Sequence, residues 1–162
     1  MQNRRLLPLV VVLSAMTLSG PAAMAAGGGG SEPVFSAVPE DPDYVAGKKA
    51  VEAMNWQAAL DAFSKVVARN PGNADAHNYL GYTYRKSGKL DLAFKHYEEA
   101  LRLDPRHRGA HEYVGEAYLM TDNLAKAEEH LKALDRICFF SCEEYRELKK
   151  AVAEFREKTA NK

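Results

Sequence analysis

The two cysteines are the residues whose type and spacing point most directly to chemistry. Cys138 and Cys142 lie four positions apart near the C-terminus, and the 162-residue chain contains no other cysteine. In an oxidising compartment such a pair forms a disulfide, which we expect here between the end of one helix and the start of the next. The alternative is a redox pair, since a cysteine at a helix N-terminus has a depressed pKa. The Cys-x-x-x-Cys spacing and the lack of a thioredoxin-like strand pattern favour the structural disulfide.

The histidines offer a weaker case for metal binding. His107 and His111 are four positions apart, a spacing that can place two imidazoles on one helical face for a metal such as zinc. No carboxylate or cysteine motif completes a site, and Arg106 and Arg108 flank His107. The sequence also has no Gly-x-Ser-x-Gly motif and no phosphate-binding glycine loop. We therefore expect no metal, no cofactor and no enzymatic activity.

The charge balance argues against one class of partner. The chain carries 22 basic and 22 acidic residues, so its formal net charge is zero. Nucleic-acid-binding proteins usually carry a basic excess that is gathered on one face. We therefore expect no nucleic-acid partner.

The N-terminal segment, 1–25, has the layout of a secretory signal peptide. Arg4 and Arg5 precede an apolar run from Leu6 to Leu18, and Ala23-Met24-Ala25 forms a cleavage motif. An uncleaved anchor is the alternative, but the apolar run is shorter than the roughly 20 residues that a spanning helix needs. We predict that segment 1–25 directs export to a bacterial periplasm, and that the mature chain has no membrane span.

The next segment, 26–39, is predicted to be a flexible leader rich in glycine and proline. Four consecutive glycines, Gly27 to Gly30, lose too much backbone entropy on ordering to hold regular structure. Pro33 and Pro39 extend the irregular region up to the first repeat, and Pro42 lies at the start of that repeat.

From residue 40 onward the sequence repeats itself at a constant spacing. The recurring small residues are Ala59, Ala93 and Ala127, together with Gly47, Gly81 and Gly115. A large side chain follows each alanine by four positions, at Phe63, Tyr97 and Leu131. The spacing within each set is constant, and a period of about 34 residues indicates stacked helical hairpins, because one hairpin cannot bury its apolar face alone. We delimit three units, at 40–73, 74–107 and 108–141.

The second unit resembles a tetratricopeptide repeat (TPR) at nearly every signature position. The matching residues are Leu80, Gly81, Tyr84, Ala93, Tyr97, Ala100 and Pro105. The first unit matches at fewer positions, and the third lacks the terminal proline. The resemblance implies an all-α fold, a solenoid of three helical hairpins followed by a C-terminal capping helix.

The capping helix is predicted where the repeat phase fails, after Ile137. We assign 142–162 to this helix and a short tail, with the helix spanning 142–158. Ser141 followed three positions later by Glu144 has the pattern of a capping box at the helix start. One apolar stripe suits a helix that covers the end of an array. It comprises Tyr145, Leu148, Val152 and Phe155.

In TPR arrays the first helices of successive units line a concave groove that cradles peptides. The resemblance therefore implies a peptide-binding groove made by the residues at the family's groove positions. These are Tyr44, Lys48, Asn78, Tyr82, Arg85, Lys86, Glu112, Glu116, Leu119 and Met120. Some members grip a C-terminal carboxylate with a lysine–asparagine clamp. Glu112 and Glu116 stand where further positive or amide groups would help, which favours a mixed-charge or extended peptide instead.

The predicted function is an exported adaptor that binds a protein or peptide partner during envelope assembly or maintenance. Two alternatives remain open. One is a thiol-redox or metal-linked periplasmic accessory protein that acts through Cys138 and Cys142. The other is a structural subunit that associates with copies of itself.

Overall fold

The computed structural model describes residues 40–161, and within that range it contains helices and no strand. The helices are α1 (Pro42–Glu52), α2 (Trp56–Arg69), α3 (Ala74–Lys86), α4 (Leu90–Leu103), α5 (Arg108–Met120), α6 (Leu124–Ile137) and α7 (Glu143–Ala160). The predicted signal peptide (1–25) and leader (26–39) lie outside the described residues. The all-α class predicted from the repeat is confirmed.

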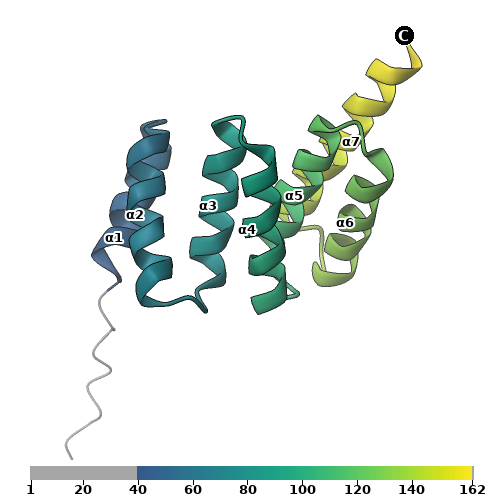
Figure 1. Ribbon diagram of the computed structural model, residues 1–162. Helices are drawn as coiled ribbons and strands as arrows, with labels where there is room; N and C mark the ends of the chain where they lie inside the picture. Colours follow the sequence, from purple (N-terminus) through teal and green to yellow (C-terminus); the bar gives the residue numbers. More distant parts are fainter. Residues whose placement is uncertain (1–39, 162) are drawn as a thin grey trace, which may run out of the picture. The chain divides into compact units, whose positions relative to one another are not determined.

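The first six helices form three hairpins that follow one another in a row (Figure 1). Helix α1 packs on α2, α3 on α4 and α5 on α6, and each pair falls inside one predicted repeat unit. Helix α3 also contacts α5, and α5 contacts α7. The first helices of successive units therefore form one layer, and this layer holds the predicted groove residues.

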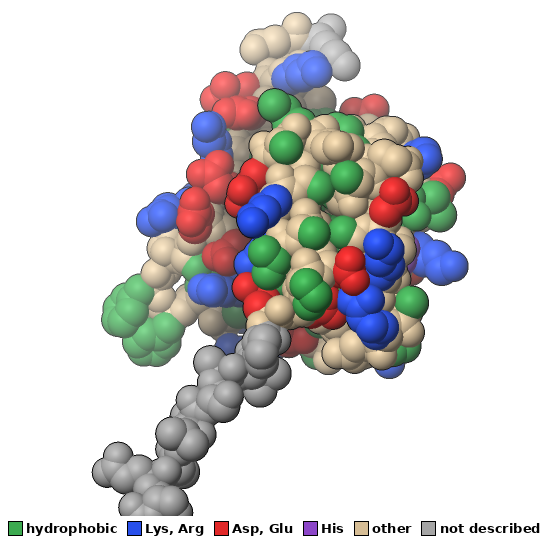
Figure 2. Space-filling view, turned by 90° about the vertical axis from the view of Figure 1, so that its left-hand side faces the viewer, with side chains coloured by type: hydrophobic (Ala, Val, Ile, Leu, Met, Phe, Trp, Pro, Cys, Tyr) green, Lys and Arg blue, Asp and Glu red, His purple; other side chains and the backbone are tan. Residues whose placement is uncertain are grey.

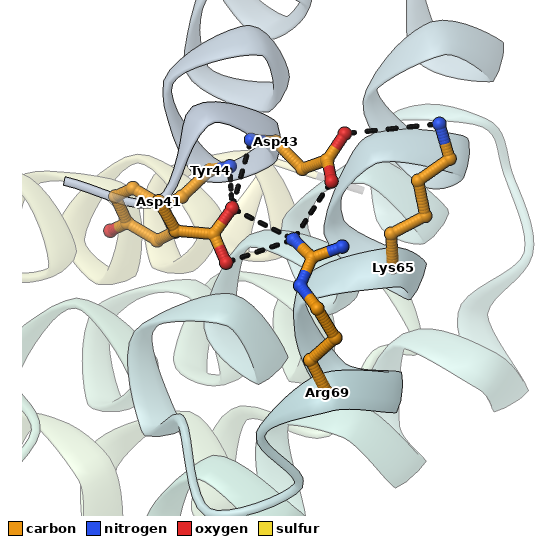
Figure 3. Close-up of polar contacts among 5 residues, drawn as sticks. All are labelled: Asp41, Asp43, Tyr44, Lys65 and Arg69. Atoms are coloured by element: carbon orange, nitrogen blue, oxygen red, sulfur yellow. Dashed lines mark hydrogen bonds and ion pairs between the residues drawn. The ribbon is translucent and has the colours of Figure 1, made fainter. Parts of the chain in front are cut away.

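The first hairpin is closed by a polar network at the N-terminus of α1 (Figure 3). Asp41 caps α1 by accepting hydrogen bonds from the backbone N–H groups of Asp43, at 2.8 Å, and Tyr44, at 3.3 Å. Arg69 donates to both carboxylate oxygens of Asp41, at 2.8 and 2.9 Å, and pairs with Asp43 at 2.8 Å. The hydrogen bond from Arg69 holds the pKa of Asp41 below its ordinary value. One guanidinium group thus joins the start of α1 to the end of α2.

Each of the first two hairpins is held close by a glycine that faces a large ring. A Cβ atom added at Gly47 would lie 2.7 Å from the ring of Phe63, and one added at Gly81 would lie 2.6 Å from the ring of Tyr97. Both rings are fully buried. The repeat phase predicted these equivalent positions, and it also places three fully buried alanines in register. They are Ala59, Ala93 and Ala127.

The third hairpin uses a different partner for its glycine. Gly115 faces the side chain of Leu148 from α7, where an added Cβ would approach to 2.6 Å, and not Leu131 of its own unit. Leu148 and Val152 are buried in one cluster with Ala127 and Leu134 of α6. Helix α7 therefore covers the third hairpin by taking the place that a fourth unit's first helix would occupy (Figure 1).

The predicted capping box at the start of α7 is wrong. The helix begins at Glu143 with Cys142 as its N-cap residue, and no side chain caps its first turn. Ser141 lies one position too early and has a φ of 32°, in the left-handed region. The disulfide between Cys138 and Cys142 constrains the turn between α6 and α7. The sequence pattern alone does not predict the backbone conformation of such a turn.

We predict that Gly81→Ala destabilises the protein by about 1–3 kcal/mol, because the new methyl group overlaps the buried ring of Tyr97. The measurement is the free energy of unfolding in urea. Gly72→Ala is the matched control, since an added Cβ there meets nothing closer than 3.5 Å. An unchanged midpoint for Gly81→Ala would mean that the close approach of these helices is not required.

Candidate functional site

The layer of first helices contains a hollow of about 380 Å³. Three of the predicted groove residues line it, Tyr44 from α1, Asn78 from α3 and Glu112 from α5. Glu144, in the first turn of α7, also lines it. Residues from all four first-layer helices therefore meet around one concavity, as the repeat geometry requires.

Asn78 lines this hollow and carries a buried hydrogen-bond acceptor. Its side chain is 5% exposed, and its Oδ1 atom has no hydrogen-bond partner among the described residues. Gly109 on α5 leaves room for the amide, because a Cβ atom there would lie only 3.1 Å from Asn78 Nδ2. Buried polar atoms are nearly always paired in folded proteins. The unpaired oxygen therefore distinguishes Asn78 from the other residues that line the hollow.

Glu112 is a half-buried carboxyl group in the same hollow, and it has no ion-pair partner among residues 40–161. Burial raises the pKa of Glu112 to about 8, and the nearby carboxylates of Glu116 and Glu144 add to this shift. Its charged form is therefore disfavoured in the free protein, and a cation placed beside it would reverse that preference.

Two tyrosines that the sequence prediction missed complete the hollow. Tyr79 and Tyr113 directly follow Asn78 and Glu112 in the chain and line the same space. The ring of Tyr79 stacks on Phe63 with centroids 4.7 Å apart, and its edge meets Tyr44 at 5.7 Å. The signal was present in the sequence, because Tyr79 and Tyr113 are equivalent positions of successive repeats.

Arg85 does not have the exposed, ligand-facing position that the prediction gave it. Its side chain is 8% exposed and pairs with Glu116 of α5 at 2.7 Å. The guanidinium group also lies over the rings of Tyr82, at 5.4 Å, and Tyr113, at 5.6 Å. Arg85 and Glu116 thus join α3 to α5, and the long apolar stem of arginine lets it be buried while its charge is paired.

The two predicted lysines stay at the surface near the aromatic side chains. Lys48 is 2.8 Å from Glu40 and lies over the ring of Tyr44 at 5.2 Å. Lys86 lies over the ring of Tyr82 at 5.4 Å. Neither lysine lines the hollow, and both therefore lie outside it.

Leu119 and Met120 were predicted to belong to the groove, and the structure places them elsewhere. They line a separate hollow together with Phe155 and other residues of α7. Leu119 also packs against the apolar cluster that α6 and α7 share. Helix α7 packs against α5 and covers the C-terminal end of α5, where Leu119 and Met120 lie. The repeat phase alone did not predict this contact.

The cysteine pair forms a disulfide between the end of α6 and the start of α7. The Cα atoms of Cys138 and Cys142 are 5.5 Å apart, and the described residues contain no free cysteine. The short loop between them carries Phe139 and Phe140, which are 90% and 85% exposed. The linkage fixes the direction in which α7 leaves the last hairpin.

His107 and His111, whose spacing alone would suit a metal, each contact a different residue. His107 caps α5 and its Nε2 atom lies 3.0 Å from Asp75, whereas His111 faces His130, with 2.9 Å between their Nδ1 atoms. Within the described part of the chain, no three histidine, cysteine or acidic side chains gather as a metal site would require. The same part contains no helix long and apolar enough to cross a membrane.

The histidines instead form two equivalent pairs, one repeat apart. His77 and His96 have Nδ1 atoms 3.1 Å apart, and the Nε2–H group of His77 donates to the carbonyl oxygen of Pro71 at 3.1 Å. His111 makes the same contacts with His130 and with the carbonyl of the equivalent proline. Burial lowers the pKa of both His96 and His130 to about 4, and the facing histidine of each pair adds to the shift.

Charged side chains are mixed over the surface. On the face in Figure 2, acidic and basic side chains are interspersed, and no broad area carries one sign alone.

Comparison with known proteins identifies the repeat. A family model described as tetratricopeptide repeat matches residues 44–105 and again residues 81–138. The sequence has no significant match among curated proteins.

Solved structures share the fold at low sequence identity. The TPR2B-domain:pHsp70 complex of yeast Sti1 has a TM-score of 0.66 and 19% identity, over 72% of this chain and 94% of that one. The Yersinia enterocolitica type III secretion chaperone SycD in complex with a peptide of the translocator YopD has a TM-score of 0.62 and 20% identity, over 74% and 92%. The first TPR of Spaghetti (RPAP3) bound to the HSP90 peptide SRMEEVD has a TM-score of 0.61 and 19% identity, over 70% and 93%.

We predict that the histidine pairs make stability fall in mild acid. The native pKa of about 4 lies below the ordinary value near 6.5, so the unfolded chain binds more protons as the pH drops. Stability from His96 and His130 is therefore complete above pH 6.5 and is lost as the pH falls toward 4. Allowing for partial solvent access, the loss is about 1–3 kcal/mol for the two together.

The test compares urea unfolding of wild type with the double variant His96→Gln, His130→Gln between pH 7.5 and 5. The measurement must compare the two proteins, because a second group also changes stability with pH. Glu112 has a raised pKa, so its contribution to the free energy of unfolding increases as the pH falls, opposite in sign to that of the histidines. The variant is expected to lose less stability than wild type on acidification. Parallel curves for the two proteins would refute the role of the histidines.

Proposed function

Because the chain belongs to the tetratricopeptide-repeat family, we propose that it is an exported adaptor that binds a protein or peptide segment in the hollow lined by α1, α3, α5 and α7. The observation that carries the proposal is the half-buried carboxyl group of Glu112, which lines this hollow beside Asn78 and has no ion-pair partner among the described residues. The backbone or a side chain of an extended segment supplies an N–H donor for that group.

The groove is suited to binding because it is built on a rigid frame. Tyr44 and Tyr79 are held in place by each other and by Phe63. Tyrosine offers a large contact area with little conformational entropy to lose. Peptide complexes of similar folds support this use of the groove: SycD is similar to this chain and holds a peptide of YopD in its complex.

Two features support an exported, periplasmic location. The N-terminal segment, 1–25, has the pattern of a cleaved signal peptide. The disulfide between Cys138 and Cys142 belongs to an oxidising compartment, where such bonds persist. In that setting an adaptor for envelope assembly or maintenance binds partners through non-covalent contacts, and it needs no catalytic group.

A site-specific crosslink tests the location of the binding site. A photoreactive phenylalanine derivative at Asp75, an exposed residue that lines the hollow, is expected to trap a discrete partner in cells. The same derivative at Asp91, an exposed residue on α4 outside the hollow, is the matched control and is expected to trap nothing comparable. Equal adducts from the two positions, or none from Asp75, would contradict the proposal.

The variant Asn78→Ala adds a second measurement. Since Asn78 Oδ1 is unpaired among the described residues, its loss is expected to cost little stability, while losing one buried hydrogen bond to the partner weakens capture about tenfold. Circular dichroism at equal temperature verifies that the variant folds. Capture at the wild-type level by folded Asn78→Ala would remove Asn78 from the site.

A further inference from the structure

The hollow contains two polar groups without partners in the described part of the chain. Asn78 Oδ1 is buried and unpaired among the described residues, and the half-buried carboxyl group of Glu112 has no cation beside it in an ion pair within that same part of the chain. Both line the same space. A ligand that places an N–H donor beside the carboxyl group of Glu112 supplies the partner that this group lacks.

The charges around the hollow are acidic in excess. Four carboxyl groups line it, against two guanidinium groups, those of Arg106 and Arg108. Arg108 is already paired with Glu144 at 3.5 Å, and His107 contacts Asp75 at 3.0 Å. Arg106 is exposed and follows Asp104 on the loop that leads into α5. Even with Glu112 protonated, as its raised pKa favours, three carboxylates line the hollow against two guanidinium groups, so the charge balance disfavours an acidic ligand.

The groups that face Glu112 come from three helices. Glu116 lies one turn away on α5, and Glu144 and Glu147 approach from α7. The cation that acts on it from α3 is Arg85, and that guanidinium is engaged by Glu116 at 2.7 Å. A new positive charge beside Glu112 would thus relieve repulsion among carboxylates as well as form its own pair.

The aromatic walls favour the same kind of ligand. Tyr44, Tyr79 and Tyr113 line the hollow, and ring faces attract cations. The protein already uses this attraction at the edge of the site, where the ammonium group of Lys48 lies over Tyr44 at 5.2 Å.

We infer that the bound segment is basic, and that an arginine side chain of the partner enters the hollow, where its guanidinium group donates to Glu112. Arginine matches the site because its planar fork presents five N–H donors and no acceptor. Lysine, with three donors on a point charge, is the second choice. This inference rests on the proposed function of the groove as a peptide-binding site.

Selection from a displayed library of short random peptides tests the inference without a known partner. On immobilised wild-type protein, arginine and lysine are expected to be enriched about fivefold or more over the unselected library. Glu112→Gln should abolish the enrichment, and it is expected to fold because it removes a disfavoured buried charge. Glu98→Gln on α4 changes the net charge equally, away from the hollow, and should retain the enrichment.

The outcomes separate the two proposals. Enriched peptides that are acidic or uncharged, or basic enrichment that survives in Glu112→Gln, would overturn the basic specificity and leave a peptide-binding groove. A failure of wild-type protein to enrich any sequence would overturn both. Enrichment lost equally in Glu98→Gln would mean attraction by net charge alone and would also reject the inference.

A selected peptide then allows a direct measurement of the contact. Replacing its arginine by citrulline keeps the shape and removes the charge. Affinity for wild type is expected to fall about tenfold, and affinity for Glu112→Gln to change less than about twofold, as a double-mutant cycle requires of two groups in contact. Wild-type binding should also release a proton near pH 8, because the cation holds Glu112 ionised. Equal losses in both proteins would place the arginine elsewhere.

Discussion

The close approach of two helices, permitted by a glycine, is the constraint on which the array depends. At Gly47 and Gly81 the absent side chain leaves room for the ring of Phe63 or Tyr97, and any Cβ atom would overlap that ring. Two helices that approach this closely form a compact helical hairpin. Successive hairpins then stack so that their first helices lie in one layer. The hollow is a consequence of that layer, because side chains at the same phase of α1, α3 and α5 converge on one surface.

The end of the array follows from the same constraint. Gly115 has the same phase as the other two glycines, yet the large side chain that fills its space is Leu148 of α7. The third hairpin therefore needs α7 for its own packing as well as for cover, and the disulfide ties α7 to the preceding helix. In this position α7 brings Glu144 to the hollow and occupies the end of α5.

The period of the sequence predicted the features that recur in each unit. It missed the features that depend on contacts between particular side chains of different helices. The hairpins, the buried alanines and the participation of Tyr44, Asn78 and Glu112 all follow from phase. Arg85 was misplaced because a charged residue is normally exposed, and only the facing Glu116 makes its burial tolerable. Leu119 was misplaced because α7 carries no repeat signature that would fix where it packs. The histidine pairs were missed because their members come from opposite helices of one hairpin.

The contrast between two carboxyl groups on α5 explains why the hollow is the functional part of this surface. Glu116 and Glu112 are one helical turn apart, and both face the layer of first helices. Glu116 meets the buried guanidinium of Arg85, so its charge contributes to holding α3 against α5. Glu112 and Asn78 line the hollow together, and neither the carboxyl group of Glu112 in an ion pair nor Oδ1 of Asn78 in a hydrogen bond has a partner among the described residues. Leaving them unpaired weakens the free protein slightly, and this loss is recovered when a donor-rich segment binds.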